Sequence, residues 1–304
     1  MQVTHRFARF NICAHSVTAL LRVSALGLML VPAAGLTEPR QVQNVSYQAV
    51  TELPAAAPNQ IFQYGATEDQ FAQLWLPKTQ SAPAPVVAFV HGGCWLDAYD
   101  ISHTQAFAKS LTEAGFAVWN IEYRRSKANQ ADSGWPIALN DIVSALNYLK
   151  LLEHPQLNTE SVQLLGHSAG GHLALLASRE VDVNGVIGLA AITQLAEYAN
   201  GEGSCQRAAQ QFMGGAPTTR AAQYAQADPL QFDWRNKSVQ LLQGSADTIV
   251  GPEQRLPSVA TNTVNGAGHF DFLYPQTAAW QQVVEALRAI TNSAEVGEAT
   301  GATK

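Results

Sequence analysis

The chain has 304 residues, of which 47% are hydrophobic and 14% are charged; this composition supports a sizeable buried core and excludes a chain that is disordered throughout. Its net charge of −6 at pH 7 argues against binding to a nucleic-acid backbone. The sequence has no zinc-type spacing of cysteine and histidine, no Walker loop and no G-x-G-x-x-G after a strand, so no metal, nucleotide or other cofactor is predicted.

The first 35 residues have the pattern of a secretory signal peptide. They contain three arginines and no acidic residue, and the short apolar run Val23–Val31 is followed by small residues suited to cleavage. The apolar run is too short to span a bilayer comfortably. We therefore expect residues 1–35 to be removed and the mature protein to be secreted or periplasmic, without membrane insertion.

Strand-like and helix-like patterns alternate along the rest of the chain. Short runs made only of apolar residues are typical of strands buried on both faces of a sheet. The predicted strands lie at residues 46–53, 61–77, 86–90, 116–121, 161–165, 184–192, 239–243 and 258–263, the first two as antiparallel strands or a hairpin, and the main predicted helices at 103–114, 136–152 and 274–290. This alternation predicts an α/β fold in which helices cover both faces of a mostly parallel central sheet. In such sheets functional groups gather at the carboxyl ends of the strands.

The chain has no linker-like break after the leader, so residues 36–290 are predicted to form a single domain. Within it, residues 193–233 hold small-residue and polar helices, which we interpret as an inserted cap. The tail at residues 291–304 is small and polar, and we expect it to be disordered.

A Gly-x-Ser-x-Gly pattern lies at residues 166–170, between a predicted strand and an apolar helix-forming run. In that context the pattern indicates a nucleophilic serine on a sharp strand-to-helix turn, where the flanking glycines leave room for a strained backbone. The helix that follows directs its free N–H groups toward the reacting oxygen. Ser168 is therefore the predicted nucleophile.

A serine hydroxyl needs an adjacent base, and the base needs a third group that orients it. Among the eight histidines, His269 lies in a glycine-rich loop between the last predicted strand and the last helix, where the order Ser–Asp/Glu–His places the base. Asp247 directly follows a predicted buried strand and is the predicted acid, with Asp228 as the alternative. His167, beside the nucleophile on the sharp turn, is expected to point away.

The tetrahedral intermediate of acyl transfer needs hydrogen-bond donors for its oxyanion. The backbone N–H of Ala169, which follows the nucleophile, is one expected donor. The N–H groups of Gly93 and Cys94 are the other two, because these residues follow a predicted buried strand in a glycine turn that lets the backbone approach the substrate.

Three aromatic residues are candidates for the substrate pocket. Trp95 and Tyr123 follow predicted strands near their carboxyl ends, and Trp135 lies just before a predicted helix. Aromatic rings offer apolar surface to an acyl or alcohol group, although such rings more often belong to the core.

Five segments occur in the order HGGCW, EYRR, GHSAGGH, GSADTIV and GAGHFDF. Together they resemble the α/β-hydrolase superfamily and, within it, the carboxylesterase branch that includes acetyl-xylan and feruloyl esterases and kynurenine formamidases. The resemblance covers residues 61–290. It implies a serine hydrolase with the triad Ser168, Asp247 and His269 and an oxyanion loop at residues 92–94. Cys94 replaces the third glycine that is more usual in that loop, so its side chain needs a place.

That place is predicted to be a disulfide with Cys205. Removal of the leader leaves two cysteines, an even count in an exported protein. Cys94 lies on the expected oxyanion loop and Cys205 at the start of the expected cap, so both belong near the catalytic edge of the sheet. We hypothesise that the bond ties the cap to the loop; the alternative is two buried thiols.

The predicted function is hydrolysis of small-molecule or polysaccharide-linked carboxylic esters through an acyl-enzyme. The nearest alternative is amide chemistry on the same triad, by an arylformamidase or a small-peptide hydrolase, and the export signal weighs against the formamidase. A non-catalytic binding module on a hydrolase fold is a more distant alternative, because the whole catalytic set is present.

Overall fold

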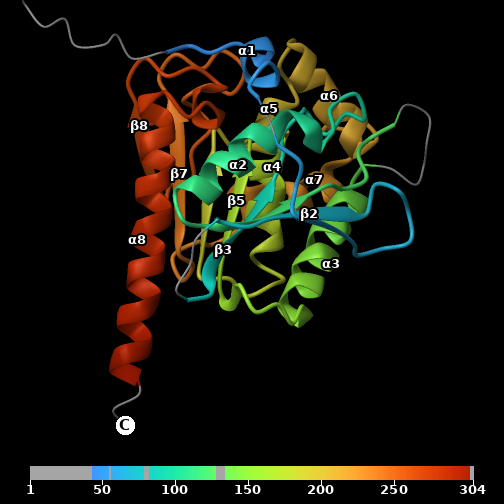
Figure 1. Cartoon of the computed structure of the whole chain (residues 1–304). Helices are drawn as coiled ribbons and strands as arrows, with labels where there is room; N and C mark the ends of the chain where they lie inside the picture. Colours follow the sequence, from blue (N-terminus) through green and yellow to red (C-terminus); the bar gives the residue numbers. More distant parts are fainter. Residues whose placement is uncertain (1–42, 55, 79–81, 128–133, 302–304) are drawn as a thin grey trace, which may run out of the picture. The chain divides into compact units, whose positions relative to one another are not determined.

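The described residues are built around an eight-stranded sheet with the strand order β1-β2-β4-β3-β5-β6-β7-β8 (Figure 1). The computed structural model describes residues 43–54, 56–78, 82–127 and 134–301, all within the unit Gln41–Lys304. The strands are β1 Gln60–Gln63, β2 Phe71–Trp75, β3 Ala84–Val90, β4 Ala117–Ile121, β5 Leu157–His167, β6 Gly185–Leu189, β7 Val239–Gly244 and β8 Ala260–Val264. The helices are α1 Tyr47–Thr51, α2 Gln105–Glu113, α3 Ile137–Leu151, α4 Ala169–Ala177, α5 Leu195–Tyr198, α6 Ser204–Met213, α7 Ala221–Ala227 and α8 Ala278–Gly301. The predicted signal peptide lies outside the described residues.

The sheet is mostly parallel, as predicted. β2 pairs antiparallel with both of its neighbours, β1 and β4, and every other pair of neighbouring strands is parallel. Parallel neighbours need crossover connections, which helices provide for most pairs, whereas β7 and β8 are joined by residues 245–259, which form no helix. The α/β fold predicted from the alternating sequence pattern is therefore confirmed.

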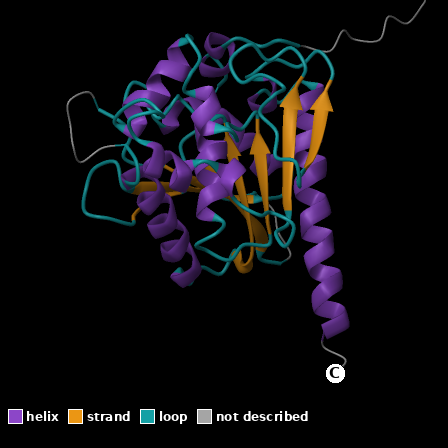
Figure 2. Ribbon diagram, turned by 180° about the vertical axis from the view of Figure 1, so that it is seen from behind, coloured by secondary structure: helices purple, strands orange, loops and turns teal. Residues whose placement is uncertain are grey.

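Helices cover both faces of the sheet, which explains why its central strands are apolar throughout. Val86 and Ala88 of β3 pack in one apolar cluster with α3 and α4, whereas Val87 and Phe89 pack in a second cluster with α2 and α8. Successive side chains of a strand point to opposite faces, so a strand covered on both sides has no solvent-facing positions. Figure 2 shows the long helix α8 lying along the sheet.

The carboxyl ends of the parallel strands meet at one edge, toward which the arrowheads in Figure 2 point. The loops after β3, β5, β7 and β8 carry Gly93, Ser168, Asp247 and His269 in turn. Helices α1, α5 and α6 lie at the same edge in Figure 1. The topology therefore brings together residues that are far apart in the sequence.

Two segments differ from the sequence predictions. Residues 46–53 were predicted as a strand, which is wrong: Ser46 caps helix α1 by accepting a hydrogen bond from the N–H of Ala49 (3.1 Å). Helix α8 continues to Gly301, whereas disorder is predicted from residue 291 onward. Alanine and glutamate residues in that stretch favour helix and extend α8. None of the helices in the described part of the chain is both long enough and apolar enough to span a membrane.

Candidate active site

Ser168 occupies the sharp turn between β5 and α4. Its φ of 56° and ψ of −120° lie outside the regions that a serine ordinarily adopts, and its N–H is anchored to the carbonyl of Leu189 (2.8 Å). A Cβ on Gly166 would overlap the carbonyl of Gly170, and a Cβ on Gly170 would overlap the backbone at the end of β3. The two glycines are therefore required for this turn, whose strain is maintained by the surrounding structure.

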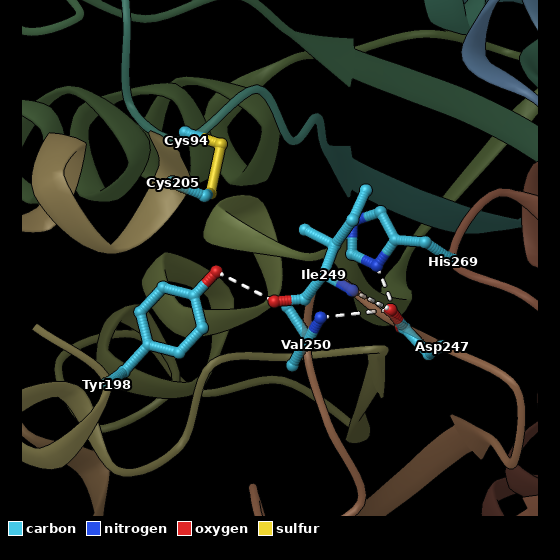
Figure 3. Close-up of a disulfide and its surroundings, with 7 residues drawn as sticks. All are labelled: Cys94, Tyr198, Cys205, Asp247, Ile249, Val250 and His269. Carbon is cyan, nitrogen blue, oxygen red and sulfur yellow. Dashed lines mark hydrogen bonds and ion pairs between the residues drawn. A yellow bond between two sulfur atoms is a disulfide. The ribbon is translucent and has the colours of Figure 1, made fainter. Parts of the chain in front are cut away.

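Asp247 and His269 are joined across the loops after β7 and β8. The Nδ1 of His269 donates to Oδ2 of Asp247 (2.8 Å), and Oδ1 of the same carboxylate accepts from the N–H groups of Ile249 (2.8 Å) and Val250 (2.9 Å). Tyr198 of α5 donates its hydroxyl to the carbonyl of Ile249 (3.0 Å), as Figure 3 shows. With the proton of the ring on Nδ1, Nε2 of His269 is left as the basic nitrogen.

The serine and the histidine meet in a cavity of about 260 Å³. The residues that line it are Tyr47, Gly93, Cys94, Tyr99, His103, His167, Ser168, Ser204, Cys205, Ile249, His269 and Phe270. Asp247 is buried behind His269. No lysine, arginine, aspartate or glutamate of the described residues lines the cavity. The structure thus brings the three predicted triad residues together at an uncharged pocket.

The loop after β3 borders this cavity through Gly93, Cys94 and Tyr99. Gly93 has a φ of 112° and Cys94 a φ of 51°, and a Cβ on Gly93 would overlap the side chain of Tyr99. Over the described ranges, the N–H groups of Gly93 and Cys94 have no protein acceptor. Ala169 is the first residue of α4, where N–H groups have no partner within the helix. The three predicted donors thus have N–H groups without a partner in the described fold, and two of them, Gly93 and Cys94, line the cavity.

Cys94 and Cys205 form a disulfide, which confirms the hypothesis drawn from the sequence. Their Cα atoms lie 5.2 Å apart, although 111 positions separate them in the chain. Cys205 is in the first turn of α6, so the bond joins the loop after β3 to the segment predicted as a cap (Figure 3). Both cysteines also line the cavity.

Removal of this disulfide by the double replacement Cys94→Ala and Cys205→Ala is expected to lower the free energy of unfolding by about 2–4 kcal/mol, because the bond closes a long loop in the unfolded chain. Urea unfolding of the variant and of the wild type, each with and without a reductant, measures the effect. The reductant should destabilise the wild type only. A variant as stable as the oxidised wild type would contradict the prediction.

Asp228, the alternative acid, has a structural role in the described fold. Its carboxylate accepts from the N–H groups of Ala196 (3.0 Å) and Leu230 (3.1 Å), next to the short helix that follows α7. It holds that turn against α5 and does not line the cavity. The choice of Asp247 over Asp228 thus agrees with the hydrogen bonds of the two carboxylates.

The expectation that His167 points away from the site is wrong. Its ring lies against that of His269, with the ring centroids 4.6 Å apart, and its Nε2 donates to the carbonyl of His269 (2.9 Å). His167 also lines the cavity. Sequence reasoning missed this contact because it depends on how the loop after β8 packs over the end of β5, 102 positions away in the chain.

The aromatic residues predicted for the pocket pack in the core or against it instead. Trp95 is fully buried and stacks on Phe212, with centroids 4.9 Å apart. Tyr123 is also fully buried and donates its hydroxyl to the carbonyl of His91 (3.0 Å), and Trp135 packs edge-on against Phe212. None of the three lines the cavity. Its aromatic residues come from α1, from the loop and short helix after β3, and from the loop that carries His269.

Buried histidines, among them His172 and His103, make the fold sensitive to acid. Burial lowers the pKa of His172 from 6.5 to about 4, and burial, with a contribution from the charge of His91, lowers the pKa of His103 to about 3. Between pH 6.5 and these values the unfolded chain binds protons that the folded chain does not, so stability falls as the pH falls. Lowering the pH from 7 to 5 is expected to reduce the free energy of unfolding by about 2 kcal/mol for each histidine.

Urea unfolding at pH 7 and at pH 5 checks this expectation. The matched variant is His172→Gln, since the glutamine amide can still donate to the carbonyl of Ala227, which Nε2 of His172 contacts at 2.7 Å, but does not titrate. Its loss of stability between the two pH values should be about 2 kcal/mol smaller than that of the wild type. Equal losses in the two proteins would show that His172 contributes nothing to the acid sensitivity.

Sequence comparisons identify the family of the chain. The model of the BD-FAE family matches residues 72–258. A probable isoprenylcysteine alpha-carbonyl methylesterase, ICMEL1 of Arabidopsis thaliana, is 31% identical over 111 residues, which are 36% of this chain and 22% of the relative. Esterase LipC of Mycobacterium tuberculosis is 28% identical over 116 residues, which are 38% of this chain and 28% of the relative. The chain thus matches about a quarter of the length of these curated relatives.

Solved structures of similar fold include esterase B from Lactobacillus rhamnosis, with a TM-score of 0.66 and 17% identity over 85% of this chain and 93% of that one. A bacterial heroin esterase has a TM-score of 0.58 and 20% identity over 72% and 78% of the two chains. A bifunctional GH43-CE protein from Bacteroides eggerthii has a TM-score of 0.62 and 21% identity over 76% and 38%. The family model covers more than half of the sequence, and the chain therefore belongs to the BD-FAE family and has the α/β-hydrolase fold of carboxylesterases.

Proposed function

We propose that the protein is an exported serine hydrolase that cleaves carboxylic esters through an acyl-enzyme intermediate. The observation that carries this proposal is the meeting of Ser168 and His269 in one cavity, with Asp247 hydrogen-bonded to the histidine. The relatives and structural neighbours named as esterases support ester hydrolysis over amide hydrolysis. The signal-peptide pattern of residues 1–35 supports a secreted or periplasmic site of action.

In the first half of the reaction, the hydroxyl oxygen of Ser168 attacks the carbonyl carbon of the ester while its proton passes to Nε2 of His269. The carboxylate of Asp247 holds the ring with Nδ1 protonated and stabilises the imidazolium ion that forms. The intermediate then expels the alcohol, which takes the proton back from Nε2, and an acyl group remains on Ser168. A water molecule repeats the sequence and releases the acid.

The negative charge on the carbonyl oxygen is stabilised by the N–H groups of Gly93, Cys94 and Ala169. These donors are fixed before the substrate arrives, so they need no reorganisation as charge develops. The helix α4 begins at Ala169, and its positive dipole end adds to the stabilisation.

The size and charge of the cavity favour a small, uncharged ester. Its volume of about 260 Å³ lies below the range of about 300–1,000 Å³ that is typical of pockets for drug-sized ligands. No charged side chain of the described residues lines it, so a charged acyl group would lose its hydration without gaining a partner. A further solved structure of similar fold, a truncated carbohydrate esterase from gut microbiota with a TM-score of 0.65 and 17% identity, supports a small ester carried on a saccharide.

A panel of substrates tests the proposal. The wild-type protein is offered p-nitrophenyl esters from acetate to decanoate and an N-formyl aromatic amine, and a fluorophosphonate probe is added in parallel. We expect hydrolysis of the short esters and, by peptide mass spectrometry, the probe on Ser168. Preference for the formyl amide would favour an arylformamidase, and a protein that neither hydrolyses any ester nor takes the probe would contradict the proposal.

A further inference from the structure

The short helix α1 lies against the loop that carries His269. Residues 44 and 45, just before the helix, donate their backbone N–H groups to the carboxylate of Asp271, at 2.8 Å and 2.6 Å. The same carboxylate accepts from the N–H of Gly268 (2.9 Å) and is only 1% exposed. A single buried carboxylate thus connects the segment before α1 to the two sides of the histidine. Buried charges are stable in proteins when hydrogen bonds satisfy them, as they do here.

Packing around this carboxylate is close. A Cβ on Gly268 would lie 3.1 Å from the Cα of Asn44 and would overlap its side chain, so the segment before α1 can approach the loop only because residue 268 is a glycine. Val45 and Val50 are buried in the same apolar cluster as Phe272. The position of α1 is therefore determined by contacts with the loop that holds the catalytic base.

Helix α1 brings Tyr47 into the cavity beside Ser168. The ring of Tyr47 contacts three others that line the cavity: the centroid distances are 5.6 Å to Tyr99, 5.7 Å to His103 and 5.6 Å to Phe270. We call these four residues the aromatic wall. Phe270 follows His269 directly, so the wall begins beside the base.

The aromatic wall is uncharged. Nδ1 of His103 donates to the carbonyl of Asp100 (2.6 Å), which leaves Nε2 as a neutral acceptor, and burial lowers the pKa of this histidine to about 3. The faces and edges of the other three rings offer apolar and weakly polar surface. Such a wall suits an apolar or aromatic group of a substrate, or a group with a hydroxyl that can donate to His103.

We infer that α1 is the substrate-selecting wall of the pocket, with Tyr47 as a specificity-determining residue and Asp271 as the positioning residue that docks it. The group selected is the uncharged acyl or alcohol part of the ester that lies against the aromatic wall. This inference rests on the proposed ester hydrolysis. Tyr47 is assigned this role because its half-buried ring lines the cavity and limits the space in it. Asp271 does not line the cavity and acts only through its hydrogen bonds to its own loop and to the segment before α1.

The test compares Tyr47→Ala with Tyr47→Phe on two series of substrates. One series lengthens the acyl group of p-nitrophenyl esters from acetate to octanoate, and the other enlarges the alcohol of acetate esters from methyl to benzyl. Removal of the ring should raise the ratio of kcat/KM for the larger over the smaller substrate by about tenfold in one series, the discrimination that an apolar pocket achieves for small differences in size. Tyr47→Phe keeps the ring and should leave both ratios within about twofold of the wild type.

Asp271→Asn tests the docking. An asparagine amide cannot accept all three N–H groups, because one end of it carries hydrogens, so α1 should loosen. We expect the same change of ratio as in Tyr47→Ala, together with faster amide hydrogen exchange in α1. The control is Tyr148→Ala, which removes a half-buried tyrosine of α3 that packs on Trp119 away from the cavity. Loss of this packing should lower the stability of the variant and leave both ratios unchanged. The variant therefore shows what a purely structural effect does to the measured ratios.

The possible results separate the two proposals. A wild-type protein that hydrolyses no ester would overturn both the proposed function and this inference. An active wild type for which Tyr47→Ala changes neither ratio by more than about twofold would overturn the inference alone. A change of ratio in one series supports the inference and identifies the part of the ester that contacts the wall.

Discussion

Ser168→Ala is expected to lower kcat for hydrolysis of p-nitrophenyl acetate by about 10⁶-fold, the loss found when the nucleophile of a serine hydrolase is removed. The other serine that lines the cavity, Ser204, has no such strained turn, whereas Ser168 has a φ of 56° and stands at the start of α4, beside the proposed donor Ala169. The backbone donors remain in the variant, so some rate above that of water is expected to persist.

The matched control is Ser204→Ala, which removes the other serine hydroxyl that lines the same cavity. This variant should keep its activity within a few-fold and should still react with a fluorophosphonate probe, whereas Ser168→Ala should not. Initial rates and probe labelling of the three proteins decide the question. Loss of labelling in Ser204→Ala with full labelling of Ser168→Ala would reassign the nucleophile.

Asp247→Asn is expected to lower kcat by about 10⁴-fold. The N–H groups of Ile249 and Val250 both donate to Oδ1 of Asp247, so the amide oxygen of an asparagine must take that position. Its NH₂ group would then face Nδ1 of His269 in place of the acceptor Oδ2. The ring would have to carry its proton on Nε2 and could not take one from Ser168.

Asp228→Asn serves as the control for this prediction, because Asp228 also accepts two backbone N–H groups but does not touch His269. Its activity should stay within a few-fold of the wild type, with some loss of stability from the weakened turn. Kinetics of both variants at pH 8 measure the difference. If Asp228→Asn were the slower enzyme, the acid of the triad would have been assigned wrongly.

The parts of the site that could be predicted from the sequence are those set by local structure. A strand, a sharp turn with small flanking residues and a helix are all encoded within a few positions of Ser168. Asp247 follows a strand whose apolar pattern is recognised in the sequence, and His269 lies in a glycine-rich loop between the last strand and the last helix. Parallel strands deliver their carboxyl ends to one edge of the sheet, which brings the two loops together. The Cys94–Cys205 bond could be predicted because both cysteines are expected near that same edge of the sheet.

The parts that could not be predicted depend on packing between distant segments. Tyr47 lines the cavity from α1, and the segment before α1 is hydrogen-bonded to Asp271, 226 positions after Val45. A serine cap before a helix of only five residues is a weak signal, so the sequence of this segment is interpreted as a strand. Trp95 and Tyr123 lie near strand ends as expected, but their rings turn into the core, a choice that their positions in the sequence do not reveal.

The covalent link between the loop after β3 and α6 has a practical bearing on how the protein is produced. Two of the residues that line the cavity, Cys94 and Cys205, take their places through a bond that forms only where thiols are oxidised. Chains made in a reducing cytoplasm carry the same triad, with an oxyanion loop that is not tethered to α6. Preparations from the two compartments therefore differ in covalent structure, and the oxidation state of the thiols should be reported with any kinetic constant measured for this protein.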